Sequence, residues 1–142
     1  MKAILGALAI ALAATPSLAG PLTVTVARAW VRPAPVGGAT AGYFTLVNRA
    51  GLPDRLTGAA SPAGSRVSLH ESRMIGAMSA MRPLAGVGVP GRGPVVFAPG
   101  GKHLMIEGLR RPLRLGDTVP ITLRLERAGA INARFQVRAT AP

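Results

Sequence analysis

The sequence contains no cysteine and only five acidic side chains in 142 residues. Without cysteine the chain cannot form a disulfide scaffold, a thiolate zinc finger, an iron–sulfur cluster, a thiol-protease site or a blue-copper centre with a cysteine ligand. With so few carboxylates and no nucleophile elbow, the chain is not expected to be an enzyme. Any chemistry must use histidine, hydroxyl groups, a few carboxylates or the thioether of methionine.

Aromatic residues are also scarce, at 4%, whereas hydrophobic residues as a whole make up 49% of the sequence. The chain carries 18 glycines and 13 prolines, which interrupt it throughout. This composition favours many short strands joined by turns over a few long helices. The length suits a single domain.

Long apolar runs are absent except at the start of the chain. Met1–Lys2 supplies a positive charge, residues 3–14 form an uncharged run, and small residues lead up to Ala19. This pattern predicts a cleavable signal peptide over residues 1–19, which leaves one exported domain over residues 20–142. The alternative is a membrane anchor, but 12 residues of helix span only about 18 Å of a hydrocarbon core of about 30 Å. We therefore expect no stable membrane span after cleavage.

Basic residues dominate the charge, with 17 lysines and arginines giving a formal net charge of +12. The arginines are scattered from Arg28 to Arg138 without a dense cluster, and almost no aromatic residues lie among them. We therefore do not expect nucleic acid as a partner. A solvated surface explains most of this charge, and attraction to an anionic envelope surface or an acidic partner protein is the next alternative.

Alternation of apolar and polar residues predicts an all-β fold, an antiparallel two-sheet sandwich with Greek-key connections and seven to nine strands. The alternation is lost for about ten residues after His70, which we interpret as a loop. The stretch from Gly86 to Gly93 is rich in glycine and proline and is also predicted to be a loop. The expected strands cover residues 22–30, 40–47, 55–59, 65–70, 81–84, 94–97, 103–109, 118–125 and 131–137.

Both histidines and all methionines except the first residue fall within residues 70–105. Imidazole nitrogen and thioether sulfur together form the donor set that selects monovalent copper over zinc, magnesium or calcium. An exported protein gains from methionine because, unlike cysteine, it cannot be oxidised to a disulfide. The six residues are His70, Met74, Met78, Met81, His103 and Met105.

Four of these residues could form one site. His103 and Met105 are two positions apart, so an extended strand places both on one face and Leu104 on the other. His70 ends one predicted strand and Met81 begins the next, and a loop between paired strands would bring them together. We expect this site at the surface, built from loops and strand ends.

Each of these residues also has a structural interpretation. Met74, Met78 and Met81 have the spacing of the apolar stripe of a helix, although Gly76 lies in its centre. A single histidine is more often hydrogen-bonded than metal-bound, and Met105 could fill a gap in the core. An exported interaction module without metal therefore stays open as the alternative function.

The spacing H-x10-M-x21-H-x-M resembles the signature of the periplasmic copper chaperones of the PCuAC family. Other stretches resemble the same family over essentially the whole predicted mature chain. They are Ala41-Gly42-Tyr43-Phe44, His70-Glu71, Met81-Arg82-Pro83, Pro99 to Met105 and Gly116 to Pro120.

This resemblance implies a cupredoxin-like or immunoglobulin-like β-sandwich that binds one Cu(I). By the same analogy the metal ligands are His70, Met81, His103 and Met105. The expected partner is a copper-accepting protein, either a subunit of cytochrome c oxidase whose copper sites are being assembled or another copper chaperone. The mature protein is expected to be a monomer.

Overall fold

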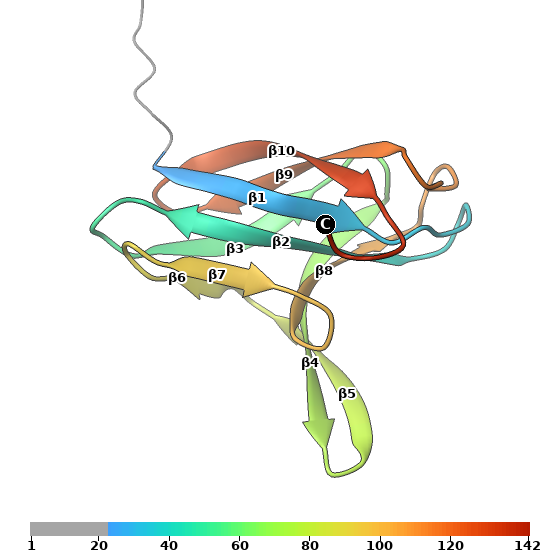
Figure 1. Ribbon diagram of the computed structural model, residues 1–142, viewed down its shortest axis with the longest axis horizontal. Coiled ribbons are helices and arrows are strands. Elements are labelled where there is room, and N and C mark those ends of the chain that lie inside the picture. The colour runs from blue at the N-terminus through green and yellow to red at the C-terminus, as the bar shows by residue number, and fades with distance from the viewer. Residues whose placement is uncertain (1–22) are drawn as a thin grey trace, which may run out of the picture.

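The computed structural model describes residues 23–142, so the predicted signal peptide over residues 1–19 lies outside the described part of the chain (Figure 1). Residues 23–142 form ten strands and no helix, and thus contain no helix that could span a membrane. The strands are β1 (Val24–Val31), β2 (Thr40–Asn48), β3 (Asp54–Ala60), β4 (Arg66–Ile75), β5 (Met78–Leu84), β6 (Val87–Val89), β7 (Pro94–Phe97), β8 (Lys102–Glu107), β9 (Thr118–Leu125) and β10 (Gly129–Val137).

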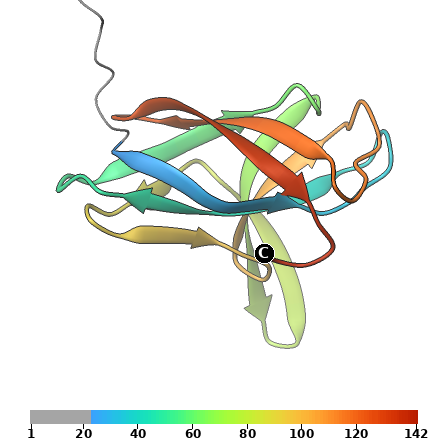
Figure 2. The same ribbon diagram turned by 45° about the horizontal axis from the view of Figure 1, so that its top comes forward.

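The strands hydrogen-bond in the order β5-β4-β8-β2-β1-β10-β9-β3-β6, and β7 also pairs with β2. This continuous sheet folds over on itself into a β-sandwich, as the two views of Figures 1 and 2 show. The predicted all-β sandwich is confirmed. All strand pairs in residues 23–142 are antiparallel except β1 with β10, which run parallel with Trp30 opposite Gln136.

One apolar core lies between the two layers of the sandwich. Phe44, Leu104 and Phe135 are at most 1% exposed, and the Phe44 ring stacks on Phe97 with 4.3 Å between centroids. Each such side chain contributes about 1.5–3 kcal/mol by leaving water. Leu104 thus points into the core as predicted, and it fixes the position of β8.

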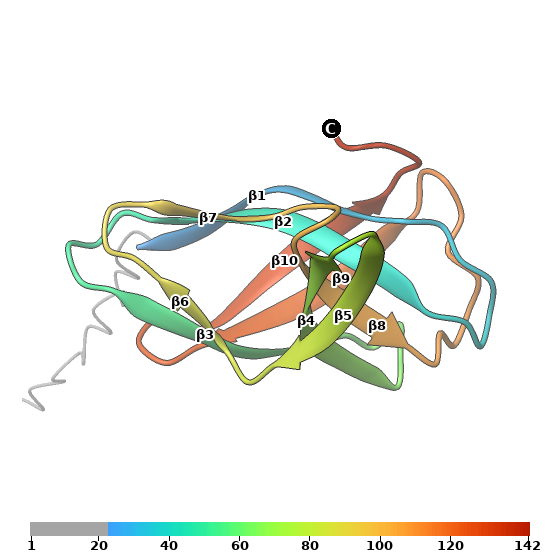
Figure 3. The ribbon, with the colours of Figure 1, turned by 90° about the horizontal axis from the view of Figure 1, so that it is seen from below.

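The second half of β4 and most of β5 leave the sandwich as a two-stranded arm, which we define as residues 71–82 (Figure 1). In Figure 3 the arm points toward the viewer. The interpretation of residues 71–80 as a loop was therefore wrong, and so was the helical alternative for the methionine stripe. Both faces of the arm are largely exposed, so its sequence does not alternate between apolar and polar residues.

A two-residue turn closes the arm. Ile75 pairs with Met78, and Gly76 has a φ of +61°. Ala77 is not among the residues with positive φ, so the turn matches type II′, in which glycine takes the first central position. The twist of this turn matches that of the flanking strands, so the two strands of the arm stay paired up to the turn.

The stretch from Gly86 to Gly93 is not all loop, because Val87–Val89 forms β6 and pairs with β3. Val87 and Val89 are buried on either side of an exposed Gly88. Three residues are too few for the alternation to stand out among the surrounding glycines and prolines. The loop prediction was therefore wrong for this short edge strand.

Asp54 joins β3 to the turn between β9 and β10. Its carboxylate accepts hydrogen bonds from the backbone N–H groups of Arg55, Arg127 and Ala128 at 2.7–2.9 Å. Partial burial alone would raise the pKa of Asp54, but these three hydrogen bonds and the nearby Arg127 charge together lower it below its ordinary value of 3.8. The carboxylate therefore stabilises this end of the sandwich in its ionised form.

Candidate metal centre

Strand pairing places both histidines side by side. In the antiparallel β4–β8 ladder His70 lies opposite His103, and Ser68 lies opposite Met105. Directly opposite residues share a face of the sheet, as do residues two apart on one strand. His70, His103 and Met105 therefore project from the same face.

The arm brings Met81 to this face as well. Met81 lies opposite Ser72 in the β4–β5 ladder, and Ser72 is two residues from His70. All four predicted ligands thus lie on one face of three adjacent strands, β5, β4 and β8, at the base of the arm. We call this surface the donor face. The four residues belong to strands rather than to the loops and strand ends that the sequence predicted.

The distances agree with this register. The rings of His70 and His103 lie 6.0 Å apart between centroids and are nearly parallel, at 22°. Beside them is a surface cavity of about 150 Å³, lined by Ala39, Thr40, Ala41, Met81, His103 and Met105. Both thioethers and one imidazole therefore line a common hollow, with the second imidazole adjacent.

Hydrogen bonds leave one nitrogen free on each imidazole. Nδ1 of His103 donates to the carbonyl oxygen of Gly101 at 3.1 Å, which leaves Nε2 with its lone pair. In His70 it is Nε2 that bonds the hydroxyl of Ser68 at 2.8 Å, while Nδ1 is buried without a hydrogen-bond partner. A buried nitrogen without a hydrogen-bond partner costs free energy, and a bound metal ion would provide the missing partner.

The electrostatics keep His70 neutral. Burial of the imidazole, followed by repulsion from His103, lowers the pKa of His70 below its ordinary value of 6.5. The unprotonated form is therefore dominant at neutral pH, and only this form can ligate a metal.

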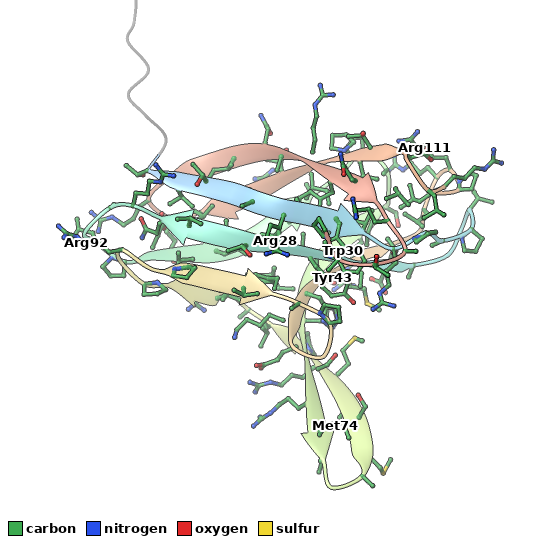
Figure 4. The ribbon with its side chains drawn as sticks, in the orientation of Figure 1. Arg28, Trp30, Tyr43, Met74, Arg92 and Arg111 are labelled. Atoms are coloured by element: carbon green, nitrogen blue, oxygen red, sulfur yellow. The ribbon has the colours of Figure 1, made fainter. Side chains whose placement is uncertain are left out.

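An aromatic cluster supports the far side of the donor face. The Tyr43 ring lies 6.3 Å from that of His103 and 4.8 Å from that of Trp30. The Arg32 guanidinium lies over both aromatic rings, at 5.8 Å from the centroid of Trp30 and 5.6 Å from that of Tyr43. Figure 4 shows Trp30 and Tyr43 together above the root of the arm. Tyr43 of β2 thus lies beside His103 and is itself packed against Trp30 of β1, and sequence reasoning did not assign this cluster a role.

The opposite face of the arm carries charges. Glu71 and Arg82 form an ion pair at 2.8 Å, and the hydrogen bond from Arg82 lowers the pKa of Glu71. Ile75 and Met78 lie on this face too, because they pair with each other one residue out of phase with Met74. The arm thus carries Met74 and Met81 on one face and the charged residues, together with Ile75 and Met78, on the other.

The donor set is selective for soft ions. Within residues 23–142 no cluster of three or more histidines or carboxylates could hold a metal ion. Zinc, calcium and magnesium sites depend on such clusters or on thiolates, whereas two imidazoles with two thioethers suit monovalent copper. The chemistry of the residues present therefore fits Cu(I).

Fold and donor face together define a small all-β domain with a His/Met donor set on one sheet face. The chain belongs to the LpqE-like family, described as "Putative lipoprotein LpqE-like", whose profile matches residues 24–137. It is 35% identical over 102 residues to the putative lipoprotein Lxx21020 of Leifsonia xyli subsp. xyli. That alignment covers 71% of this chain but only 61% of the relative's length.

Solved structures of PCuAC domains share this fold. The copper-bound PCuAC domain from PmoF2 is 28% identical, with a TM-score of 0.67 over 83% of this chain and 94% of that domain. Apo-DR1885 from Deinococcus radiodurans is 34% identical, with a TM-score of 0.64 over 99% of this chain and 95% of that protein. The CuI form of DR1885 is 32% identical, with a TM-score of 0.60 over 84% of this chain and 83% of that one. The resemblance to PCuAC noted from the sequence thus agrees with family membership and fold.

Proposed function

We propose that this protein is a copper chaperone that binds one Cu(I) through His70, Met81, His103 and Met105. The observation that carries the proposal is the common donor face, on which strand register gathers two imidazoles and two thioethers from separate parts of the chain. The likeness to copper-bound PCuAC structures supports copper as the cargo.

The proposed ligands suit a carrier that must also release its ion. Nδ1 of His70 and Nε2 of His103 are the nitrogen atoms available for copper. Thioethers are neutral, soft donors, so a ligand of the acceptor can replace Met81 or Met105 on the ion without any proton being gained or lost by the methionine. Met81 is 52% exposed, which opens the site to a partner at its arm side.

The place of action and the partner follow from the same proposal. We infer export through a cleavable signal peptide over residues 1–19 to the periplasm. The lipoprotein names of the family and of its relative support an exported or envelope protein. The acceptor would be a copper-site subunit of cytochrome c oxidase or another copper chaperone. The protein acts as a monomeric carrier rather than as an enzyme.

A competition titration tests the proposal. The mature protein is titrated with Cu(I) against a colorimetric chelator under reducing conditions, alongside Met81→Leu and Met78→Leu. Leucine conserves apolar volume and removes sulfur, and both side chains are more than half exposed, so neither change should affect folding. We expect a stoichiometry of one and a loss of at least about tenfold in affinity for Met81→Leu alone, since even outer partners of metal ligands contribute that much.

The rival function predicts a different outcome. An interaction module without metal would take up no stoichiometric Cu(I), or Met81→Leu and Met78→Leu would both bind copper as the wild type does. Either result would refute the chaperone assignment.

A further inference from the structure

We propose that Met74 is an additional copper ligand used during transfer, outside the four-ligand resting site. It would share the ion with Met81 and carry it outward along the arm to the acceptor. This inference rests on the proposed function. It concerns the route that the ion takes rather than whether the ion is bound.

Strand register gives Met74 its position. Met74 lies opposite Ser79, two residues from Met81 along β5, so Met74 and Met81 are diagonal neighbours on the donor face. Diagonal cross-strand neighbours lie about 7–8 Å apart at the backbone, within the reach of two long side chains. The intervening Ser72 and Ser79 are small and leave the path between the two thioethers open.

Exposure rises step by step along this path. His103 is 4% exposed, Met81 is 52% exposed and Met74 is 69% exposed. Met74 therefore fills no core gap, which is the usual structural role of a methionine. Figure 4 shows it on the arm, well away from the sandwich. The soft donors thus form a series from the buried end of the site toward the arm tip.

An apolar docking patch at the arm tip would not account for Met74. The other exposed apolar side chains there, Ile75 and Met78, pair with each other on the opposite face, beside the row that holds Arg73 and the Glu71–Arg82 ion pair. Met74 is on the donor face, where it lies opposite Ser79 and diagonal to Met81. Its sulfur, rather than its apolar surface, is what this position offers.

The exchange step is balanced without redox chemistry. A bond forms between Cu(I) and Sδ of Met74 as the bond between Cu(I) and Nδ1 of His70 breaks, while Met81 stays bound. Both ligands are neutral, so no proton or electron moves and copper stays monovalent. Ligands of the acceptor then displace His103, Met105, Met81 and finally Met74, with one bond to copper forming as each of these bonds breaks.

Transfer kinetics separate this route from the resting site. Proteins loaded with one equivalent of Cu(I) are mixed in a stopped-flow instrument with excess bathocuproine disulfonate, and the coloured complex is followed. The variants are Met74→Leu and the matched control Met78→Leu, an equally exposed methionine on the other face. We expect Met74→Leu to slow transfer by about tenfold, with its equilibrium affinity within about threefold of wild type, and Met78→Leu to match wild type in both.

Methyl NMR of methionine-labelled protein gives a second readout. The Met81 and Met105 methyl signals should shift with one equivalent of Cu(I), the Met74 signal should broaden because Met74 binds the ion only transiently, and the Met78 signal should not change. Equal transfer rates for all three proteins would overturn the inference. So would a loss of affinity in Met74→Leu as large as that in Met81→Leu, because Met74 would then be a resting ligand. Failure of the wild type to bind Cu(I) at all would instead overturn the proposed function.

Discussion

Replacing Gly76 with alanine should loosen the arm while leaving the sandwich folded. Gly76 has a φ of +61°, and an added Cβ would meet no atom within 4 Å, so the cost is backbone strain alone. For an L-residue with a side chain this strain is about 1–2 kcal/mol. The arm is exposed on both faces, so it can relieve the strain by local opening rather than by global unfolding.

Gly129 provides a matched control in the body of the protein. It has a φ of +76°, and a Cβ there would also meet nothing within 4 Å. Its turn, however, joins β9 to β10, where Ile121, Leu123 and Phe135 are buried in the core. The same penalty must therefore appear in the free energy of unfolding of the whole domain. For a domain of this size, about 1–2 kcal/mol lowers Tm by roughly 4–8 °C.

Two measurements distinguish the variants. Trp30 is the only tryptophan and is buried, so its fluorescence reports unfolding of the sandwich. We expect Gly129→Ala to lower Tm, and Gly76→Ala to leave it nearly unchanged while amide hydrogen exchange over residues 71–82 accelerates about 5- to 30-fold, the factor equivalent to that penalty. Equal falls in Tm for both variants, with unchanged exchange in the arm, would show that the arm is not an independent unit.

Three further predictions concern the site and the core. Ser68→Ala should lower Cu(I) affinity by about tenfold with little change in Tm, because the His70 ring loses the hydrogen bond that orients it. A competition titration with Cu(I) would measure this loss of affinity. Asp54→Ala should cost about 1–3 kcal/mol at pH 7 in urea unfolding. Because folding lowers the pKa of Asp54, its contribution is complete above the unfolded value of 3.8 and is lost as pH falls through the lower folded value, so the difference between the variant and wild type should shrink steadily in acid. Leu104→Ala, at a fully buried position, should cost about 2–5 kcal/mol in the same assay, and a smaller loss would contradict the packing of β8.

Alternation predicted the strands that have one buried and one exposed face. Residues 118–125 form β9 as expected, and residues 131–137 belong to β10, because their apolar side chains alternate between core and solvent. The arm gave no such signal, since backbone hydrogen bonds hold it together and neither of its faces is buried. The only local sign of a hairpin in this stretch of the sequence was Gly76, a residue type that favours turns. The parallel pairing of β1 with β10 could not be predicted, because alternation is independent of strand direction.

The candidate site was only partly predictable from the sequence. The shared face of His103 and Met105 follows from their spacing on any strand. Whether His70 and Met81 share a face depends on the length of the turn between them, and the predicted loop did not define that length. With Ile75 opposite Met78, residues 70 and 81 fall on the same face; a turn one residue longer would have placed them on opposite faces. The hydrogen bonds that free one nitrogen of each imidazole depend on three-dimensional placement and have no signature in the sequence.

Three consecutive residues of β8 serve both the core and the donor face, because alternate side chains point to opposite faces. Leu104 anchors the strand in the interior, while its neighbours His103 and Met105 face the opposite way. Substitution of His103 and Met105 therefore leaves the Leu104 side chain in the core. The same backbone could be redesigned to carry a different ion, with thioethers exchanged for harder donors, without rebuilding the interior that holds the strand in place.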